Sequence, residues 1–218
     1  MTQFRPTRFE VLPTIIKNLL IINGLVFLAQ NTFAGPTSSF SFEDYFALHA
    51  WQSDLYKPWQ LITHMFLHGD FSHILGNMFA LWMFGSILEN VWGPKRFLLF
   101  YMLCGVGAAI IHLAILSYQL VPLTTQYDRL LNSATLGASG AVFGILIAFV
   151  YLFPNTYIYI YFLFPVKAKW LGIAYFAFEL YKGIENSAGD NVARWAHVGG
   201  AIIGFILVYI WKKKGTSS

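Results

Sequence analysis

Charged side chains are scarce in this protein. Only 11% of its 218 residues are Asp, Glu, Lys or Arg, whereas 57% are hydrophobic. A soluble domain has about a quarter charged residues, so this chain has too few charges to cover a surface that faces water on all sides. The deficit excludes an ordinary soluble protein and indicates an integral membrane protein.

Cysteine is also scarce, and long basic stretches are missing. The single cysteine, Cys104, lies within an apolar run, so it forms no intramolecular disulfide and is expected to be a small buried hydrophobe. The net charge of +4 comes from short basic clusters beside apolar runs. Because no basic stripe alternates with exposed aromatic residues, nucleic acid is not an expected partner.

A metal centre is not expected either. His64 and His68 are four residues apart and His73 follows, but no cysteine or carboxylate stands at ligand spacing and the zinc-protease motif H-E-x-x-H is absent. The alternative is a structural role, in which His64 and His68 fix the chain where it enters the membrane. We expect no metal and no other cofactor.

Long apolar runs take the place of these features. A helix needs about 20 mostly apolar residues to cross the hydrocarbon core of a bilayer. The sequence predicts six such spans within one domain, residues 1–218, and no cleavable signal peptide. The expected fold class is an all-α polytopic membrane protein, with spans at Thr14–Thr32, Phe71–Leu88, Phe97–Leu116, Gly137–Phe153, Trp170–Tyr181 and Trp195–Trp211.

Lysine and arginine are distributed unevenly between the two ends of these spans. Ten flank the end at which both termini lie, and four flank the other end. Cytoplasmic loops are enriched in basic residues, so both termini are expected in the cytoplasm, as an even number of spans requires. The six-span plan without a targeting peptide predicts a cell (plasma or inner) membrane.

Two connections differ from ordinary polar loops. The first outside loop, from Phe33 to about Asp70, is rich in aromatic residues, so it is expected to be structured and partly embedded in the membrane. The connection between the fourth and fifth spans contains Pro154 and Pro165. These prolines favour a turn and an interfacial connector over a continuous helix.

The sequence GASGAVFG, from Gly137 to Gly144, opens the fourth span. Small residues are common where membrane helices pack, and Gly140 and Gly144 form a small-xxx-small pair. The motif also differs from the G-x-S-x-G elbow of soluble hydrolases, because a glycine directly follows Ser139. Taken alone, the motif favours packing over catalysis.

A histidine in the sixth span changes this interpretation. His197 precedes Gly200 and Gly204, which form a second small-residue stripe able to dock against the first. Docking would bring His197 beside Ser139 at similar depth. An imidazole beside a hydroxyl is the minimum apparatus for nucleophilic catalysis.

Polar residues of the second span are predicted at the same depth. His73 and Asn77 are four residues apart and share a helix face. Their N–H groups could donate to a developing oxyanion or form an interhelical hydrogen bond. The pair alone does not decide between these two roles.

These features together resemble the rhomboid family of intramembrane serine proteases. The resemblance runs from the first outside loop to the last span, with the motifs in the expected order. Family members often have Trp-Arg where this chain has Trp59-Gln60, so a neutral hydrogen bond is expected to replace an ion pair in the first loop. The matching segments are WQLITHMFLHGDFSHILGN (Trp59–Asn77), ENVWGPKRF (Glu89–Phe97), GASGAVFG (Gly137–Gly144) and AHVGG (Ala196–Gly200).

The resemblance implies a role for each motif. Ser139 would be the nucleophile and His197 the general base of a dyad without an acidic third member, since the apolar part of span six contains no Asp or Glu. His73, Asn77 and the backbone N–H of Ser139 would form the oxyanion hole. Structural roles fall to the E-x-x-x-G-x-x-R turn and the two glycine stripes: Glu89, Gly93, Arg96, Gly140, Gly144, Gly200 and Gly204.

The implied activity is cleavage of the transmembrane segments of single-pass proteins in a hydrated cavity open to the extracytoplasmic side. We expect such substrates and membrane lipid as partners, with substrate entering beside span five. An inactive relative would be expected to have lost Ser139 or His197, and both are present. A transporter would need polar residues along its full depth, whereas those named here fall in the outer half of the spans.

Overall fold

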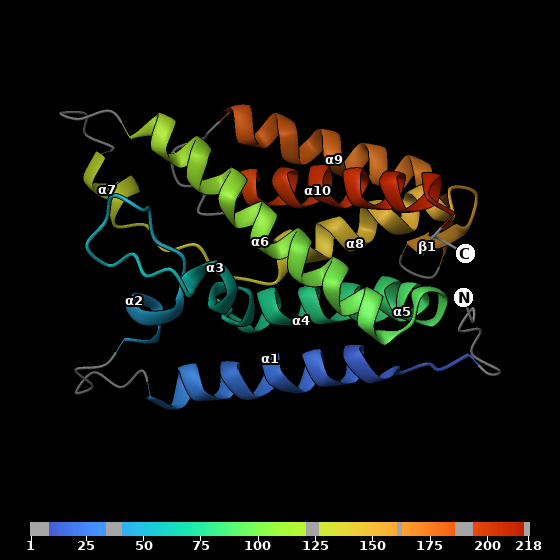
Figure 1. The fold of residues 1–218 in the computed structure, drawn as a ribbon, viewed down its shortest axis with the longest axis horizontal. Coiled ribbons are helices and arrows are strands. Elements are labelled where there is room, and N and C mark those ends of the chain that lie inside the picture. The colour runs from blue at the N-terminus through green and yellow to red at the C-terminus, as the bar shows by residue number, and fades with distance from the viewer. Residues whose placement is uncertain (1–8, 34–40, 121–126, 161–162, 186–193, 216–218) are drawn as a thin grey trace.

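The fold is a bundle of helices that run back and forth between two ends (Figure 1). The computed structural model describes residues 9–33, 41–120, 127–160, 163–185 and 194–215. Short helices lie in the connections: α2 (Phe42–Phe46), α3 (Gln60–Thr63), η1 (His64–Phe66) and α7 (Tyr127–Leu131). The bundle itself consists of α1 (Thr14–Phe33), the continuous unit α4 (Phe71–Ala80), η2 (Leu81–Gly85) and α5 (Ser86–Trp92), then α6 (Pro94–Gln119), α8 (Ser139–Leu152), α9 (Ala168–Glu185) and α10 (Arg194–Lys213).

A helix lies at each of the six predicted spans, within a few residues of the predicted bounds. By length and composition, four of them can cross a bilayer: α1, the α4–α5 unit, α6 and α10. The apolar helix α8 has 14 residues, and α9 has 18. The protein is therefore a helical membrane bundle, and the number of six crossings stays a prediction.

The predicted all-α class is wrong in one detail, the connection between α8 and α9. Here β1 (Tyr157–Ile160) and β2 (Phe164–Lys167) form an antiparallel hairpin in which Tyr157 lies opposite Lys167. The prolines correctly predict a connector at this place. The alternation of tyrosine and isoleucine in the first half of the connector is typical of a strand, and it gives the connector its shape.

The core of the bundle lies around α8. Nearly all residues of this helix from Gly140 to Phe149 are buried, and α6, α9 and α10 pack against it. On the α6 side, the rings of Phe97, Phe100 and Tyr101 are fully buried. A short helix surrounded in this way has little contact with lipid, so α8 is a rigid platform for the residues at its ends.

Glycines bring α8 and α10 into backbone contact. A Cβ on Gly204 would lie 2.6 Å from the Cα of Gly144, and a Cβ on Gly200 would overlap the carbonyl oxygen of Gly140. Helices approach this closely only where the side chains are absent. This glycine seam fixes the separation of the two helices at the end where both begin.

A buried carboxylate holds α1 against α5. The Glu89 side chain is 3% exposed, and its oxygens accept hydrogen bonds from the N–H groups of Ile15 and Ile16, both at 2.9 Å. These N–H groups belong to the first turn of α1, where the helix supplies no acceptor of its own. The negative charge also opposes the positive end of the helix dipole, so Glu89 caps α1 from another helix.

The turn after α5 joins three helices. Gly93 has a φ of 80°, which favours glycine, and Pro94 then occupies the first position of α6. The Arg96 guanidinium lies 4.4 Å from the ring centre of Trp211, a cation–π contact that ties this turn to the last turns of α10.

The second span is not a regular α-helix. Between α4 and α5 it widens into the π-helical segment η2. A π turn takes up an additional residue, so it changes the face on which the residues after it lie. This one span carries His73 and Asn77 near its start and Glu89 near its end.

One glutamine organises the first outside loop. Gln60 is fully buried, and its Oε1 accepts hydrogen bonds from the N–H groups of His49 and Lys57, at 3.3 and 3.1 Å. Its Nε2 donates to the carbonyl oxygen of Leu55 at 2.9 Å, and two carbonyl oxygens of α2 lie within 3.4 Å. The expected neutral hydrogen bonding is present and uses both ends of the amide.

Candidate active site

Ser139 is the first residue of α8 and follows a turn that contains Gly137. Gly137, two residues earlier, has a φ of 124°, a region that favours glycine, and its N–H donates to the carbonyl oxygen of His64 at 2.9 Å. A Cβ on Gly137 would lie 2.8 Å from Nε2 of His73. Glycine therefore lets the chain pass His73 and turn into α8.

The glycine seam brings His197 and Ser139 together. Nε2 of His197 lies 2.8 Å from Oγ of Ser139, within hydrogen-bond distance. His197 is 9% exposed, and the ring of Phe143 stacks on its imidazole with centroids 4.4 Å apart and an interplanar angle of 11°. Phe143 lies one helical turn after Ser139, so α8 supplies both the hydroxyl and the surface that fixes the plane of the imidazole.

The structure adds Glu179 of α9, a residue that the sequence analysis did not include. Its Oε2 lies 2.9 Å from Nδ1 of His197, and its Oε1 accepts a hydrogen bond from Nη1 of Arg194 at 2.9 Å. The expectation of a serine–histidine pair without an acidic neighbour is therefore wrong. That expectation considered only the sixth span, whereas the carboxylate comes from the fifth.

A signal for Glu179 was present in the sequence. The stretch WLGIAYFAFEL, from Trp170 to Leu180, contains one Asp, Glu, Lys or Arg residue, Glu179. Ionisable side chains inside a membrane span are costly, and they usually face an internal partner. The sequence does not say which partner, because Glu179 and His197 lie on different helices and helical spacing relates only residues of one helix.

His73 faces the start of α8 from α4. Its Nε2 lies near Gly137, as described above, and its Nδ1 lies 3.4 Å from the N–H of Gly69. A backbone N–H can only donate, so this contact places the lone pair on Nδ1 and the proton on Nε2. Asp70 caps the helix by accepting from the His73 N–H at 2.8 Å, and the Nε2 side of the ring lies against Gly137, two residues before the serine.

Asn77 lies one turn along α4 from His73. Its Nδ2 donates to the His73 carbonyl oxygen at 3.0 Å, which leaves the second N–H of the amide for another acceptor, and the residue is 7% exposed. The first turn of α8 adds backbone N–H groups, including that of Ser139, for which the helix has no acceptor. Donor groups therefore lie on two helices, α4 and α8, that pack against each other.

Two histidines of the first outside loop, His64 and His68, are also buried, and the His68 ring lies edge-on to the ring of His73 with centroids 5.1 Å apart. Burial lowers the pKa of both His64 and His68 to about 4. Nδ1 of His64 lies 2.7 Å from the carbonyl oxygen of Gln60. Among the residues that the structure describes, no group of three or more His, Cys, Asp or Glu side chains is placed to hold a metal ion.

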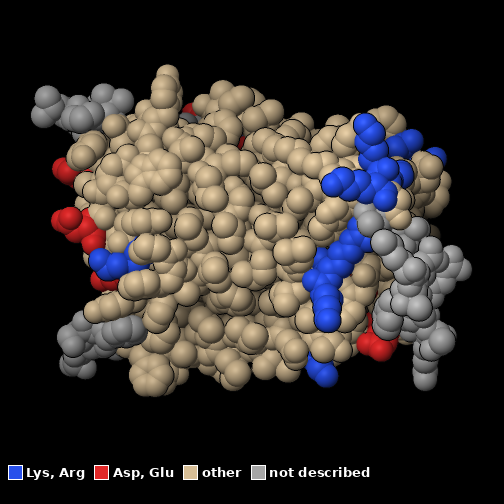
Figure 2. Space-filling view, viewed as in Figure 1, with Lys and Arg blue, Asp and Glu red and all other residues tan. Residues whose placement is uncertain are grey.

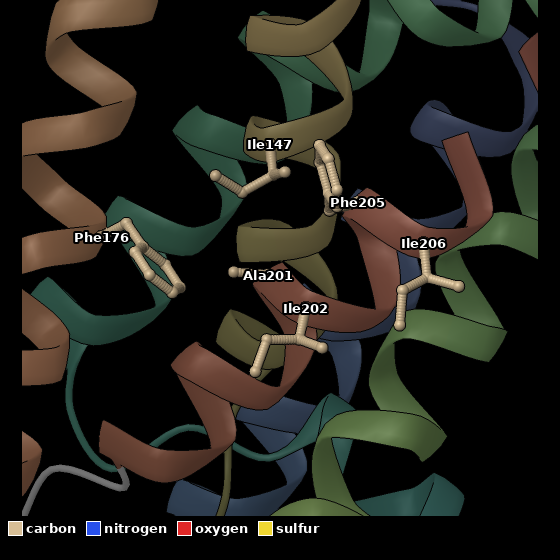
Figure 3. Close-up of a pocket in the computed structure, with 6 residues that line it drawn as sticks. All are labelled: Ile147, Phe176, Ala201, Ile202, Phe205 and Ile206. Carbon is tan, nitrogen blue, oxygen red and sulfur yellow. The ribbon is translucent and has the colours of Figure 1, made fainter. Parts of the chain in front are cut away.

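An apolar hollow of about 300 Å³ lies between α8, α9 and α10, and it is separate from the polar group. Figure 3 shows its lining side chains, Ile147, Phe176, Ala201, Ile202, Phe205 and Ile206. Ala201 follows His197 by one helical turn, so the hollow lies farther along α10. Because its walls carry no polar side chain, it offers no chemistry of its own.

Comparisons with known proteins find relatives that are named as rhomboid proteins. The chain is similar to "RHOMBOID-like protein 6, mitochondrial" of Arabidopsis thaliana, with 32% identity over 84% of this chain and 53% of the relative. It is 32% identical to "Putative rhomboid protease YdcA" of Bacillus subtilis, over 72% of this chain and 68% of the relative. It is 30% identical to "Rhomboid protease AarA" of Providencia stuartii, over 87% of this chain and 69% of the relative.

The chain spans about half the length of the mitochondrial relatives that it matches. The model of the rhomboid domain matches residues 56–214, which begin in the first outside loop and include every residue of the polar group around Ser139. The chain belongs to the rhomboid family.

Proposed function

We propose that this protein is an intramembrane serine protease in which Ser139 is the nucleophile and His197 the general base. The observation that carries the proposal is the 2.8 Å separation of Ser139 Oγ and His197 Nε2. The membership of the rhomboid family supports it, as do two relatives whose names describe rhomboid proteases.

The reaction begins when Ser139 Oγ attacks the carbonyl carbon of the scissile peptide bond and its proton passes to His197 Nε2. The C–N bond then breaks as Nε2 returns this proton to the leaving nitrogen. Water next attacks the acyl ester on Ser139, gives a proton to Nε2, and the serine is released. His197 therefore accepts and returns one proton in each half of the reaction.

The oxyanion of the tetrahedral intermediate needs donors that are already in place. His73 Nε2–H, the free N–H of the Asn77 amide and the backbone N–H of Ser139 are the donors that we assign to it. In a well-studied soluble protease, one such donor is worth about 3 kcal/mol of transition-state stabilisation. Their fixed positions on α4 and α8 make reorganisation during the reaction unnecessary.

The proposed substrates are the transmembrane segments of single-pass proteins. A helical substrate hides its carbonyl groups in i to i+4 hydrogen bonds, so it must unwind locally to reach Ser139. We propose that it enters laterally beside α9, the helix that carries exposed Trp170, Tyr175 and Phe178 toward the surroundings of the bundle. Water enters at the end of the bundle where α8 and α10 begin.

The proposed topology has six crossings with both termini in the cytoplasm of a cell (plasma or inner) membrane. Figure 2 supports the orientation, because the visible Lys and Arg gather mostly at one end of the molecule and acidic residues mark the opposite end. The first residues of α1 and the last of α10 lie at the basic end (Figure 1). By the positive-inside rule this end is cytoplasmic, so the polar group faces the other side.

The test compares cleavage of a tagged single-span substrate by the wild-type protein and by Ser139→Ala and His197→Ala, reconstituted in lipid vesicles. We expect both variants to lose at least about 10³-fold in kcat, because both groups act on the same proton transfer. A fluorophosphonate probe should label the wild type and not Ser139→Ala. Cleavage by either variant at the wild-type rate would overturn the assignment.

A further inference from the structure

Glu179 is an acidic side chain buried in an apolar bundle. It is 2% exposed, and an ionised carboxylate in such surroundings is costly unless it is paired. Both of its oxygens are paired, because Oε1 accepts from Arg194 and Oε2 lies 2.9 Å from His197 Nδ1. The mechanism proposed above gives this carboxylate no part in proton transfer.

The contact with Glu179 determines which nitrogen of His197 carries the proton. A carboxylate can only accept, so Nδ1 holds the proton and Nε2 keeps its lone pair. Nε2 is the atom that lies 2.8 Å from Ser139 Oγ. The ring is therefore held in the one tautomer that can accept the serine proton.

Two neighbours restrict the remaining freedom of this arrangement. Phe143 stacks on the imidazole and fixes its plane, while Arg194 fixes the carboxylate from its far side. The guanidinium can only donate hydrogen bonds, so it pairs with Glu179 only when a carboxylate oxygen faces it. The second oxygen then points at His197.

We propose that Glu179 is a positioning residue for His197 and that Arg194 holds the carboxylate in this role. The inference rests on the proposed function, because it requires His197 to be the general base. When the serine proton moves to Nε2, the imidazolium is stabilised by the carboxylate, and the other proton stays on Nδ1. The protein thus has an acidic third member of its catalytic group, supplied by α9.

A purely structural ion pair between Glu179 and Arg194 predicts different behaviour. Its loss would lower the stability of the protein and leave the turnover of the folded fraction unchanged. A positioning role predicts a fall in kcat with little change in KM, because the buried carboxylate is paired with His197 and Arg194. The two roles are separated by measuring both parameters together with the thermal stability.

The first variant is Glu179→Gln, which keeps the shape of the side chain. Because Arg194 only donates, the amide oxygen turns to Arg194 and the amide N–H₂ faces His197 Nδ1, which favours the tautomer with the proton on Nε2. We expect kcat to fall about 10²-fold with KM within about twofold. In ¹⁵N NMR of histidine-labelled protein, the His197 signals should move to those of the other tautomer.

The second variant, Glu179→Gln with Arg194→Met, tests whether Arg194 determines which end of the introduced amide faces His197. Without the guanidinium, the amide oxygen is free to turn back to Nδ1, so we expect kcat to recover at least about fivefold over Glu179→Gln alone. The matched control is Glu185→Gln on the same helix, whose side chain is exposed and pairs with Lys182, and it should retain wild-type kcat. All rates are taken per folded protein isolated by size exclusion.

The inference is overturned if Glu179→Gln keeps the wild-type kcat, or if the double variant is no faster than the single one. Ser139→Ala and His197→Ala are assayed beside these variants. If they are inactive while Glu179→Gln is fully active, only the role of Glu179 fails. If Ser139→Ala still cleaves the substrate, the proposed function itself fails.

Discussion

Glu89 of α5 and Glu179 of α9 are 3% and 2% exposed, and both oxygens of each carboxylate are bonded at 2.9 Å. Their partners differ. Glu89 binds two backbone N–H groups of α1, which cannot change their protonation, whereas Glu179 binds an imidazole and a guanidinium. Burial and complete pairing are therefore common to both sites, and the chemistry of the partner separates a residue that joins helices from one that acts on a reactive group.

Glycine shows the same contrast between the α1 side and the α8–α10 side. A Cβ on Gly24 of α1 would meet nothing within 4 Å, whereas one on Gly200 of α10 would overlap the backbone of α8. α1 is thus held at its end by a carboxylate, and the first half of α10 is held by backbone contact with α8. The first two predictions below change one side at a time, and the third concerns the first outside loop.

The largest effect is expected for Glu89→Ala. The variant leaves the N–H groups of Ile15 and Ile16 without their charged acceptor, and hydrogen bonds to charged groups contribute about 2 kcal/mol each. We expect the free energy of unfolding to fall by about 4 kcal/mol, as measured by thermal or denaturant unfolding in detergent, with kcat of the folded fraction unchanged. Glu43→Ala, at an exposed site on α2, is the control, and an equal loss there would refute the capping role.

A single added methyl group should disrupt the contact between α8 and α10 at the glycine seam. Gly200→Ala forces α10 away from α8, and overpacking of this kind costs about 3 kcal/mol. Because the same movement separates His197 from Ser139, cleavage and fluorophosphonate labelling should both decrease. Gly24→Ala, where the methyl meets no neighbour, should instead raise stability by about 1 kcal/mol. Similar effects of the two changes would mean that the seam does not set the helix separation.

Acid should destabilise the protein through the first outside loop. Burial lowers the pKa of His64 from the usual 6.5 to about 4, so between these pH values the unfolded chain binds a proton that the folded protein does not. Stability is therefore complete above pH 6.5 and falls as the pH approaches 4, by about 2 kcal/mol at pH 5 for this residue. Melting temperatures between pH 7 and pH 5 check this, and His64→Gln should make the dependence less steep.

The sequence predicts those parts of the site that depend on local spacing. Gly140, Gly144, Gly200 and Gly204 recur at four-residue intervals, and such stripes indicate where helices meet. The stripes do lie against each other, and they bring Ser139 and His197 within hydrogen-bond distance. His73 and Asn77 likewise share a face because they are one turn apart.

Contacts between distant segments were not predictable in the same way. Glu179 reaches His197 from another helix, and Glu89 caps a helix that begins 75 residues earlier, at Thr14. Spacing within a helix says nothing about the partner of such residues. The hairpin after α8 was missed for a different reason, because its proline signals outweighed a short alternation of Tyr157, Ile158 and Tyr159.

The π-helical segment η2 gives the second span two faces that a regular helix of the same sequence would not combine. Before it lie the proposed oxyanion donors, and after it lies the carboxylate that caps α1. Each residue of an α-helix turns the chain by about 100°, so a deletion within Leu81–Gly85 would rotate one of these faces away from its partner. The span is consequently constrained in length more strictly than in composition, and homologous chains are expected to vary its lipid-facing side chains while keeping the number of residues between His73 and Glu89.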